Sequence, residues 1–346
     1  SNACIVAGLR AAVRLAKVVD REESAAGWSS LADRIWHEGI LREPVVDRRG
    51  PGMVDPDTGR FFDARRLSTL RGLWTDRPEY LVEHSAALDV SLLGPAVPFG
   101  LLEAGDARLR RCAEGIFRHN LFAGESNLLT LWAADPARPI ADAVPGEGHK
   151  IDLSPLASLW MARYLLQLGR ETGEGRHWNL AVSMLDGILG RLSSLGLAVR
   201  PAPRPSDPPR LSLGASGVWE LHAMLIETML DLAGLDYNAP ARRVRLSPAL
   251  PGSWPSIGVG HRFPCGEVAY RLDRPVGGTV HRLGLRAKLD HPALLDIDLT
   301  CPDLDDLGPW NAAPSAPAPS LDRRTGRLRW SVELPAGETD RQWTWG

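Results

Sequence analysis

The sequence has little lysine, few cysteines and no long apolar run. Lysine occurs only at Lys17, Lys150 and Lys288, and the net charge is −2, so no basic field favours a nucleic acid partner. No apolar run approaches the ~18 residues that cross a bilayer, so no membrane partner is expected either. A glycine-rich phosphate loop, a His-Glu-x-x-His helix and a nucleophile elbow are also missing. Paired carboxylates are therefore the only chemistry that the sequence suggests, with no cofactor and no metal.

The composition is that of an ordinary globular protein. Its 346 residues predict two domains, and a hydrophobic content of 44% supplies a sizeable core. The cysteines are scattered, and no pair has the spacing of metal ligands, so we expect buried free thiols. The cysteines are Cys4, Cys112, Cys265 and Cys301.

The first residues predict that the chain starts within a longer protein. Residues 1–3, Ser-Asn-Ala, look like the remnant of an expression tag. The residues that follow begin without a methionine and already have helical spacing, so we expect an upstream part of the same protein to be missing. A targeting signal would lie in that part, which leaves the compartment open, with the cytoplasm favoured.

Apolar residues recur at helical spacing up to about residue 234. Amphipathic segments alternate with nearly all-apolar ones, such as 155–169 and 216–234, and an apolar helix is expected to be covered on all sides. Two concentric layers of helices, arranged as antiparallel hairpins, would explain the alternation. The expected helices span residues 4–20, 23–41, 64–75, 78–93, 106–121, 155–169, 177–194 and 216–234.

At about Asn238 the pattern changes to period two, with glycine, proline and aspartate turns between the runs. These runs predict an antiparallel β-sandwich of roughly 100 residues. They begin at Val244, Ile257, Glu267, Leu283, Leu294 and Leu328. The predicted domains are therefore a helical domain over 4–238 and a β-sandwich over 239–346, after the tag remnant 1–3.

The stretch Pro145–Leu168 joins a polar loop to an apolar helix. Ser154 is expected to be the N-cap of that helix, with Pro155 at its first position. A connection as long as the one between Phe122 and Pro155 is usually functional or disordered, and its apolar residues favour function. The polar and aromatic residues that it carries include Trp132, Asp135, Glu147, His149 and Asp152.

A family resemblance is carried by three stretches of the sequence. They are Ala87-Leu-Asp-Val-Ser-Leu-Leu-Gly-Pro with Asp106-Ala-Arg-Leu, Gly146-Glu-Gly-His-Lys-Ile-Asp-Leu-Ser-Pro, and Ser216-Gly-Val-Trp-Glu-Leu-His-Ala-Met. The first resembles a helix-turn-helix of bacterial family 15 glucoamylase-like enzymes. The second is similar to the loop before an inner helix in that family and to the acid-bearing segment of family 65. The third resembles the last barrel helix of families 65, 78 and 95.

The resemblance implies the C-terminal portion of a six-hairpin glycosidase, an (α/α)6-barrel glycoside hydrolase of carbohydrate metabolism. The expected fold is mainly α: an (α/α) toroid of antiparallel helical hairpins, followed by a C-terminal antiparallel β-sandwich. The expected helices are fewer than those of a full ring, so a partial toroid and a complete one both stay open. The glutamate that serves as base in family 15 would fall near Arg200, where this chain has no carboxylate.

Glycoside cleavage in this superfamily uses two carboxyl groups, one that protonates the leaving oxygen and one that activates water, ~6.5–9.5 Å apart for inversion. We assign Glu147 as the acid and Glu220, early in the helix 216–234, as the base. The expected partner is an oligosaccharide or another glycoside. The expected substrate-binding residues are Trp132, Asp135, His149, Asp152, Trp219 and His222.

Other interpretations stay open for these residues and for the function. Glu147 could be a solvated loop residue or a cap, and the macrodipole alone favours Glu220 near a helix N-terminus. One alternative function is a non-catalytic carbohydrate-binding or structural module with a degenerate glycosidase fold. Another is a glycoside phosphorylase, in which phosphate takes the place of the base.

Overall fold

The computed structural model divides the chain into two compact units. The first unit comprises residues 1–164 with 186–218, and the second comprises residues 165–185 with 219–346. The structure describes residues 2–41, 54, 90–122, 128–129, 154–190, 217–274, 281–300, 319–324 and 326–345. The expected helix 64–75 and most of 78–93 lie outside these ranges, and the domain boundary at residue 238 stays a prediction.

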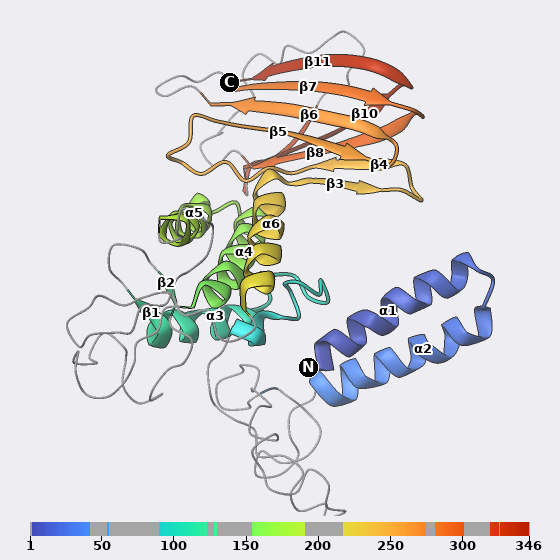
Figure 1. The fold of residues 1–346 in the computed structure, drawn as a ribbon, viewed down its shortest axis with the longest axis vertical. Coiled ribbons are helices and arrows are strands. Elements are labelled where there is room, and N and C mark those ends of the chain that lie inside the picture. The colour runs from blue at the N-terminus through green and yellow to red at the C-terminus, as the bar shows by residue number, and fades with distance from the viewer. Residues whose placement is uncertain are drawn as a thin grey trace, which may run out of the picture. The chain divides into compact units, whose positions relative to one another are not determined.

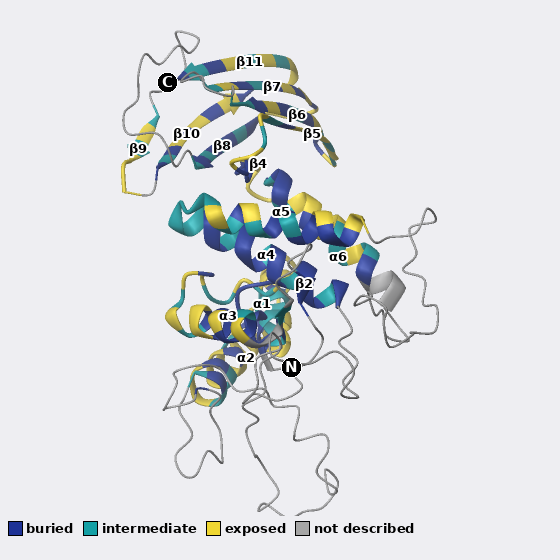
Figure 2. Ribbon diagram, turned by 90° about the vertical axis from the view of Figure 1, so that its left-hand side faces the viewer, coloured by how far each residue is buried: buried dark blue, intermediate teal, exposed yellow. Residues whose placement is uncertain are grey.

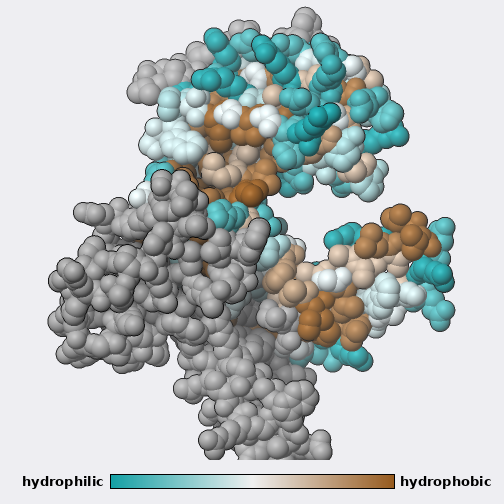
Figure 3. Space-filling model, viewed as in Figure 1, coloured by the Kyte–Doolittle hydropathy of each residue, from teal (hydrophilic) through white to brown (hydrophobic). Residues whose placement is uncertain are grey.

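Two N-terminal helices form the predicted antiparallel hairpin (Figure 1). α1 spans Asn2–Val18 and α2 spans Glu22–Arg34, and a π-helical segment, η1, continues α2 over Ile35–Ile40. Small and branched side chains of both helices are buried, whereas the end of α1 keeps apolar residues exposed, which gives the brown surface of the hairpin in Figure 3. The exposed residues at this end are Leu15, Val18 and Val19. The apolar stripe of α1 is therefore wider than its contact with α2.

The other long helices lie where the apolar spacing predicts them. They are α3 (Ala107–Asn120), α4 (Pro155–Thr172), α5 (Gly175–Leu189) and α6 (Gly217–Ala233), with a short 3-10 helix, η4 (Val90–Leu93), before α3. Asp106 caps α3, because its carboxylate accepts from the Arg108 backbone N–H at 2.9 Å. A side-chain hydrogen bond from Arg108 lowers the pKa of Asp106, and the resulting anion sits at the helix end where the dipole favours it.

α4 and α6 are both rich in apolar residues, but they differ in burial (Figure 2). No residue of α4 is exposed, as expected for an inner helix. α6 has one buried stripe that includes Leu221 and Thr228, while Ile226, Met229 and Leu230 are 60%, 48% and 41% exposed. The expectation that α6 is covered on all sides is therefore wrong. Burial depends on what the neighbouring elements cover, and the hydropathy of a helix does not determine its neighbours.

Two β-sheets form the C-terminal part of the second unit (Figure 1). One has five strands in the order β3-β4-β8-β10-β9, and the other has four in the order β11-β7-β6-β5. The strands are β3 (Leu235–Asn238), β4 (Arg243–Leu246), β5 (Ser256–Phe263), β6 (Gly266–Asp273), β7 (His281–Leu289), β8 (Ala293–Thr300), β9 (Ser320–Asp322), β10 (Arg327–Leu334) and β11 (Gly337–Trp345). A further short pair, β1 (Leu121–Phe122) and β2 (Leu128–Leu129), lies before α4.

Tryptophan rings connect the inner faces of the two sheets. Trp330 of β10 lies edge to face against Trp343 and Trp345 of β11, with ring centroids 5.9 and 6.3 Å apart. All three side chains are buried, as expected for the core of a β-sandwich. The coarse prediction, helices followed by two largely antiparallel sheets, is confirmed, whereas the closure of the helices into a ring stays a prediction.

The strand prediction needs two corrections. β4 runs parallel to β8, with Val244 opposite Leu295, so the sheet is not antiparallel throughout. The two strands are far apart in sequence, and no tight turn forces an antiparallel direction on them. The sequence patterns also missed β3, β9 and β11. In β11 six of the nine residues are polar and only Trp343 and Trp345 are buried, so the period-two signal is weak.

The thiol prediction is confirmed only in part. The described cysteines Cys4, Cys112 and Cys265 are all free, and Cys112 and Cys265 are buried. Cys4, however, is exposed on α1, which contradicts the expectation of burial. It lies one residue from the buried Ala3 on a helix that buries only one face, so its side chain falls on the solvent side. Cys301 lies outside the described residues.

Candidate functional site

The two ends of the long connection before α4 are held together by buried hydrogen bonds. The Ser154 backbone N–H donates to the Leu129 carbonyl at 2.8 Å, and the Leu129 N–H donates to the Ser158 hydroxyl at 3.0 Å. The Ser158 hydroxyl in turn donates to the Ser154 carbonyl at 2.7 Å. Ser154 and Ser158 are 2% and 0% exposed, so water cannot replace these bonds. Leu129 therefore lies beside Ser154 at the N-terminus of α4, although 24 residues separate the two in sequence.

The same serine begins the helix. The Ser154 hydroxyl accepts from the Ala157 N–H at 3.1 Å, which confirms the predicted N-cap. The first half of α4 is then fixed against the segment before α3. The Trp160 indole N–H donates to the Val97 carbonyl at 2.5 Å, and the Tyr164 hydroxyl donates to the Ala104 carbonyl at 2.8 Å. The connection thus ends on a rigid element, which is how loops that carry function are usually supported.

Most of the predicted site residues lie outside the described residues. These are Trp132, Asp135, Glu147, His149 and Asp152. Trp219 and Glu220 lie in the first turn of α6, where the structure describes the backbone but not these side chains. His222 is half-buried on the same helix. The separation of Glu147 and Glu220, and the gathering of the other six residues around them, therefore stay predictions.

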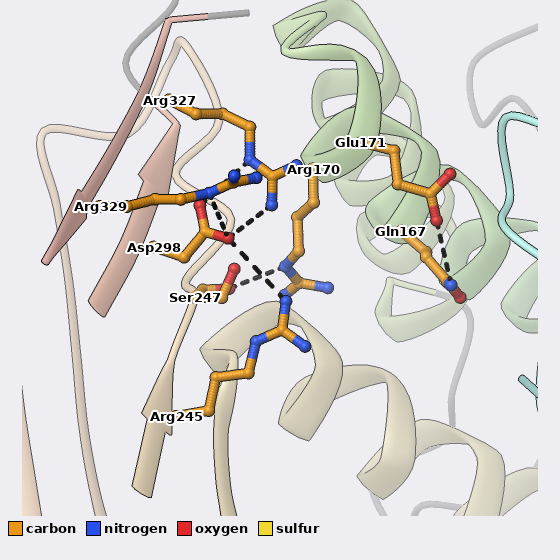
Figure 4. A network of polar contacts seen from close by, with 8 residues as sticks. All are labelled: Gln167, Arg170, Glu171, Arg245, Ser247, Asp298, Arg327 and Arg329. Atoms are coloured by element: carbon orange, nitrogen blue, oxygen red, sulfur yellow. Dashed lines mark hydrogen bonds and ion pairs between the residues drawn. The ribbon is translucent and has the colours of Figure 1, made fainter. Parts of the chain in front are cut away.

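A polar cluster that the sequence did not suggest lies at the other end of α4 (Figure 4). The Arg170 Nε donates to the Ser247 carbonyl at 2.7 Å, and its Nη2 donates to the Asp231 carbonyl. Burial lowers the pKa of the Arg170 guanidinium to about 10. One side chain of α4 thus binds both the last turn of α6 and the residue that follows β4.

Beside Arg170, the Asp298 carboxylate of β8 lies among arginine side chains of the two neighbouring strands, β4 and β10 (Figure 4). Asp298 accepts from Arg327 of β10 at 2.5 Å and from Arg329 at 3.3 Å, and the Arg245 Nη2 of β4 lies 4.0 Å away. The contacts of Arg170 and Asp298 therefore join strands of the five-stranded sheet to α4 and α6. The only signal for this cluster in the sequence is that aspartates alternate with apolar residues along β8, and that arginines alternate with apolar residues along β4 and at the start of β10.

The described part of the chain holds neither a cluster of metal ligands nor a membrane-spanning helix. Among the described residues, no group of three His, Cys, Asp or Glu lies close enough to hold a metal ion. In the same ranges, no helix is both long and apolar enough to cross a membrane. The candidate site is therefore defined by the fold and by the hydrogen bonds that join Leu129 to the N-terminus of α4.

The fold resembles that of two solved α-L-rhamnosidases. An α-L-rhamnosidase from Dictyoglumus thermophilum matches 98% of this chain with a TM-score of 0.54 and 9% identity, over 31% of its own length. A Streptomyces avermitilis α-L-rhamnosidase complexed with L-rhamnose matches 99% with a TM-score of 0.52 and 13% identity, over 26% of its length. A GH127 β-L-arabinofuranosidase from Geobacillus stearothermophilus aligns with a TM-score of only 0.36 and 10% identity.

These likenesses concern the fold alone. The chain spans less than a third of the length of the two rhamnosidases. No protein-family model and no curated protein sequence matches it. The coarse resemblance to glycoside hydrolases is confirmed, while families 15, 65 and 95 gain no support from these neighbours.

Proposed function

We propose that this chain is a glycoside hydrolase-like protein that binds a saccharide in a toroid of helices and cleaves a glycosidic bond with inversion. Glu147 protonates the leaving oxygen, and Glu220 activates the attacking water. The observation that carries the proposal is the set of buried hydrogen bonds by which Leu129, Ser154 and Ser158 meet at the N-terminus of α4, on either side of residues 130–153. This connection contains Glu147 together with Trp132, Asp135, His149 and Asp152.

The chemistry requires different environments for the two carboxyl groups. The acid must keep its proton near neutral pH, which burial achieves by disfavouring the anion. The base must be ionised, and the positive end of the α6 dipole favours the anion at Glu220. The proposed contacts with sugar are Trp132 and Trp219 as stacking surfaces, with Asp135, His149, Asp152 and His222 as hydrogen-bonding groups. The likeness in fold to two α-L-rhamnosidases supports a saccharide substrate and makes α-L-rhamnosides the first substrates to test.

The decisive experiment compares leaving groups in two variants. Glu147→Gln should lower kcat by about 10²–10⁴-fold on glycosides with sugar or alkyl leaving groups, because these need a proton. It should lower kcat far less on a 2,4-dinitrophenyl glycoside, whose leaving group departs unprotonated. Glu220→Gln should lower turnover of both substrates, since water attacks in both cases. Proton NMR of the first product should show the inverted anomer.

Two exposed glutamates serve as matched controls. Glu114 lies on α3 and Glu227 on α6, and both are exposed. Glu114→Gln and Glu227→Gln remove the same charge at positions outside the proposed site and should leave kcat unchanged. Unchanged turnover in Glu147→Gln would rule out Glu147 as the acid, and activity on the activated glycoside in Glu220→Gln would exclude Glu220 as the base.

The alternative of a non-catalytic module has its own support. The family 15 base would fall near Arg200, where this chain has no carboxylate. Saccharide binding by calorimetry without turnover in the unmodified chain would favour this alternative. Turnover that requires inorganic phosphate and yields a sugar 1-phosphate would instead indicate a phosphorylase.

A further inference from the structure

A cavity of about 230 Å³ lies where three turns of the β-sandwich meet. The turns join β3 to β4, β5 to β6 and β7 to β8. Pro264 and Pro292 supply apolar walls, and Tyr237 supplies an aromatic ring that also lies against Phe263, with centroids 5.3 Å apart. The volume is somewhat below the ~300–1,000 Å³ of sites for drug-sized ligands, so it suits a molecule with a single small ring.

The polar residues that line the cavity carry mainly basic or neutral donors. They are Arg242, His291, Tyr237 and Cys265, and none of the described lining residues is acidic. Arg242 has no ion pair with the described residues. The next arginines of β4 do have such pairs, since Arg243 lies 2.8 Å from Asp296 and Arg245 lies near Asp298. A guanidinium that lines a concave site without a carboxylate partner is available to a ligand anion.

The backbone holds Arg242 in this position. Its φ is +49°, a left-handed conformation that glycine and asparagine adopt much more readily than arginine. Two hydrogen bonds fix the turn on either side: the Arg242 N–H donates to the Ala239 carbonyl at 3.1 Å, and the Arg242 carbonyl accepts from the Leu294 N–H at 2.9 Å. An unfavourable backbone conformation at an arginine that lines a cavity motivates a search for function at that residue.

Hydrogen bonds link the other polar residues of the cavity. A hydrogen bond with the Cys265 thiol raises the pKa of the Tyr237 phenol. The Cys265 carbonyl accepts from the Asp290 N–H at 2.8 Å, so the β5–β6 turn is tied to the turn that carries His291. Arg242, Cys265 and His291 therefore sit on turns and Tyr237 sits on β3, and backbone hydrogen bonds tie the Cys265 turn to Asp290 and the Arg242 turn to β8.

We propose that this cavity binds a small carboxylate with a hydroxylated ring, of the size of one uronic acid. The planar Arg242 guanidinium binds the carboxylate in a bidentate fork, and His291 and Tyr237 donate to the remaining oxygens. The proline walls and the tyrosine ring contact the C–H face of the sugar ring. The site uses none of the residues assigned to glycoside cleavage, so a test of this site and a test of the proposed function are independent of each other.

Titration calorimetry of the full chain with D-glucuronate and D-galacturonate tests the proposal. A ligand with so few contacts should have a Kd in the millimolar range, so concentrations up to about 50 mM are needed. Arg242→Gln should abolish binding. Arg286→Gln is the matched control, because Arg286 lies on β7, is 83% exposed and pairs with Asp340 at the surface. Its binding curve should equal that of the unmodified chain.

Alkylation of Cys265 by iodoacetamide, followed by peptide mass spectrometry, locates the ligand. At about ten times the Kd, the uronate should slow alkylation of Cys265 about tenfold, because only the free form reacts. Alkylation of the exposed Cys4, which does not line the cavity, should not change. If Cys265 does not react within the experiment, the calorimetric comparison of the two arginine variants decides alone.

Each other outcome overturns the proposal. These outcomes are no heat of binding up to about 50 mM, equal binding of neutral glucose, equal binding of inorganic phosphate, and retained binding in Arg242→Gln. Equal binding of glucose would mean that the carboxylate is not recognised. Equal binding of phosphate would indicate a general anion site without selection for the ring.

Discussion

Replacing Gly234 by alanine tests how α6 is joined to the sandwich. Gly234 follows α6 and precedes β3, with a φ of +62°. Its N–H donates to the Leu230 carbonyl at 2.8 Å, and its carbonyl accepts from the Ser247 N–H at 2.7 Å. An added Cβ would overlap the Ser247 carbonyl group and would lie 2.7 Å from the Pro248 nitrogen. These are backbone atoms, which cannot turn away as a side chain can.

The expected loss of stability has two parts. The left-handed conformation costs alanine about 1–2 kcal/mol. Moving the backbone of residues 247–248 away from the new methyl group costs about 1–3 kcal/mol more, as in other overpacked positions. Gly337→Ala separates the two parts, since Gly337 belongs to the same unit, has a φ of +94° and has nothing within 4 Å of an added Cβ. It should lose only the conformational part.

The measurement is urea unfolding followed by tryptophan emission. Trp178, Trp330, Trp343 and Trp345 are buried in the same unit as Gly234, so their emission reports its unfolding. We expect Gly234→Ala to lower the free energy of unfolding by about 2–5 kcal/mol and Gly337→Ala by about 1–2 kcal/mol. Equal losses in the two variants would refute the steric argument, because they would mean that residues 247–248 move at no cost.

Two further predictions concern buried polar side chains of the same unit. Arg170→Met should lower the free energy of unfolding by about 1–3 kcal/mol, because the Ser247 and Asp231 carbonyls lose their donor, whereas Arg176→Met at a 73% exposed position should change it little. No difference between these variants in urea unfolding would contradict the role given to Arg170. Burial raises the pKa of Tyr270, whose hydroxyl donates to the Ala233 carbonyl at 2.5 Å, so the unfolded chain loses this proton at a lower pH than the folded chain. The contribution of Tyr270 to stability is therefore complete below the ordinary tyrosine pKa of about 10 and is lost as the pH rises above it. Tyr270→Phe lacks this group, so its free energy of unfolding should fall less between about pH 9 and 11 than that of the unmodified chain. Identical slopes in that range would show that Tyr270 is not the group responsible.

Local signals in the sequence predicted the described helices and most strands well. Ser154 was expected to cap α4, and its hydroxyl does accept from the Ala157 N–H. The alternation of Leu295, Ile297 and Leu299 with aspartates placed β8 correctly. These features depend on residues within one or two turns of each other, and the physical rules for such spacings are short-ranged.

Contacts between distant segments were not predictable in the same way. Nothing near Val244 indicates that β4 will lie parallel to β8, and nothing near Ile226 indicates that this side chain stays exposed. Arg170 looked like an ordinary basic residue in the last turn of a helix, where the dipole favours it. Its hydrogen bonds to Ser247 and Asp231 exist only because three separate segments meet there.

The two candidate sites also differ in how far the sequence predicts them. Glu147, Glu220 and their neighbours were identified from residue type and local pattern, and their mutual placement is still a prediction. The cavity of Arg242, Cys265 and His291 was invisible in the sequence, because its residues come from three turns of two different sheets. The sequence by itself determined which segments are helices, which alternate as strands, and where the caps lie, because these depend on neighbours along the chain. Only the tertiary structure decided which faces are buried and which polar groups meet, because burial and pairing depend on segments that are distant in sequence and close in space.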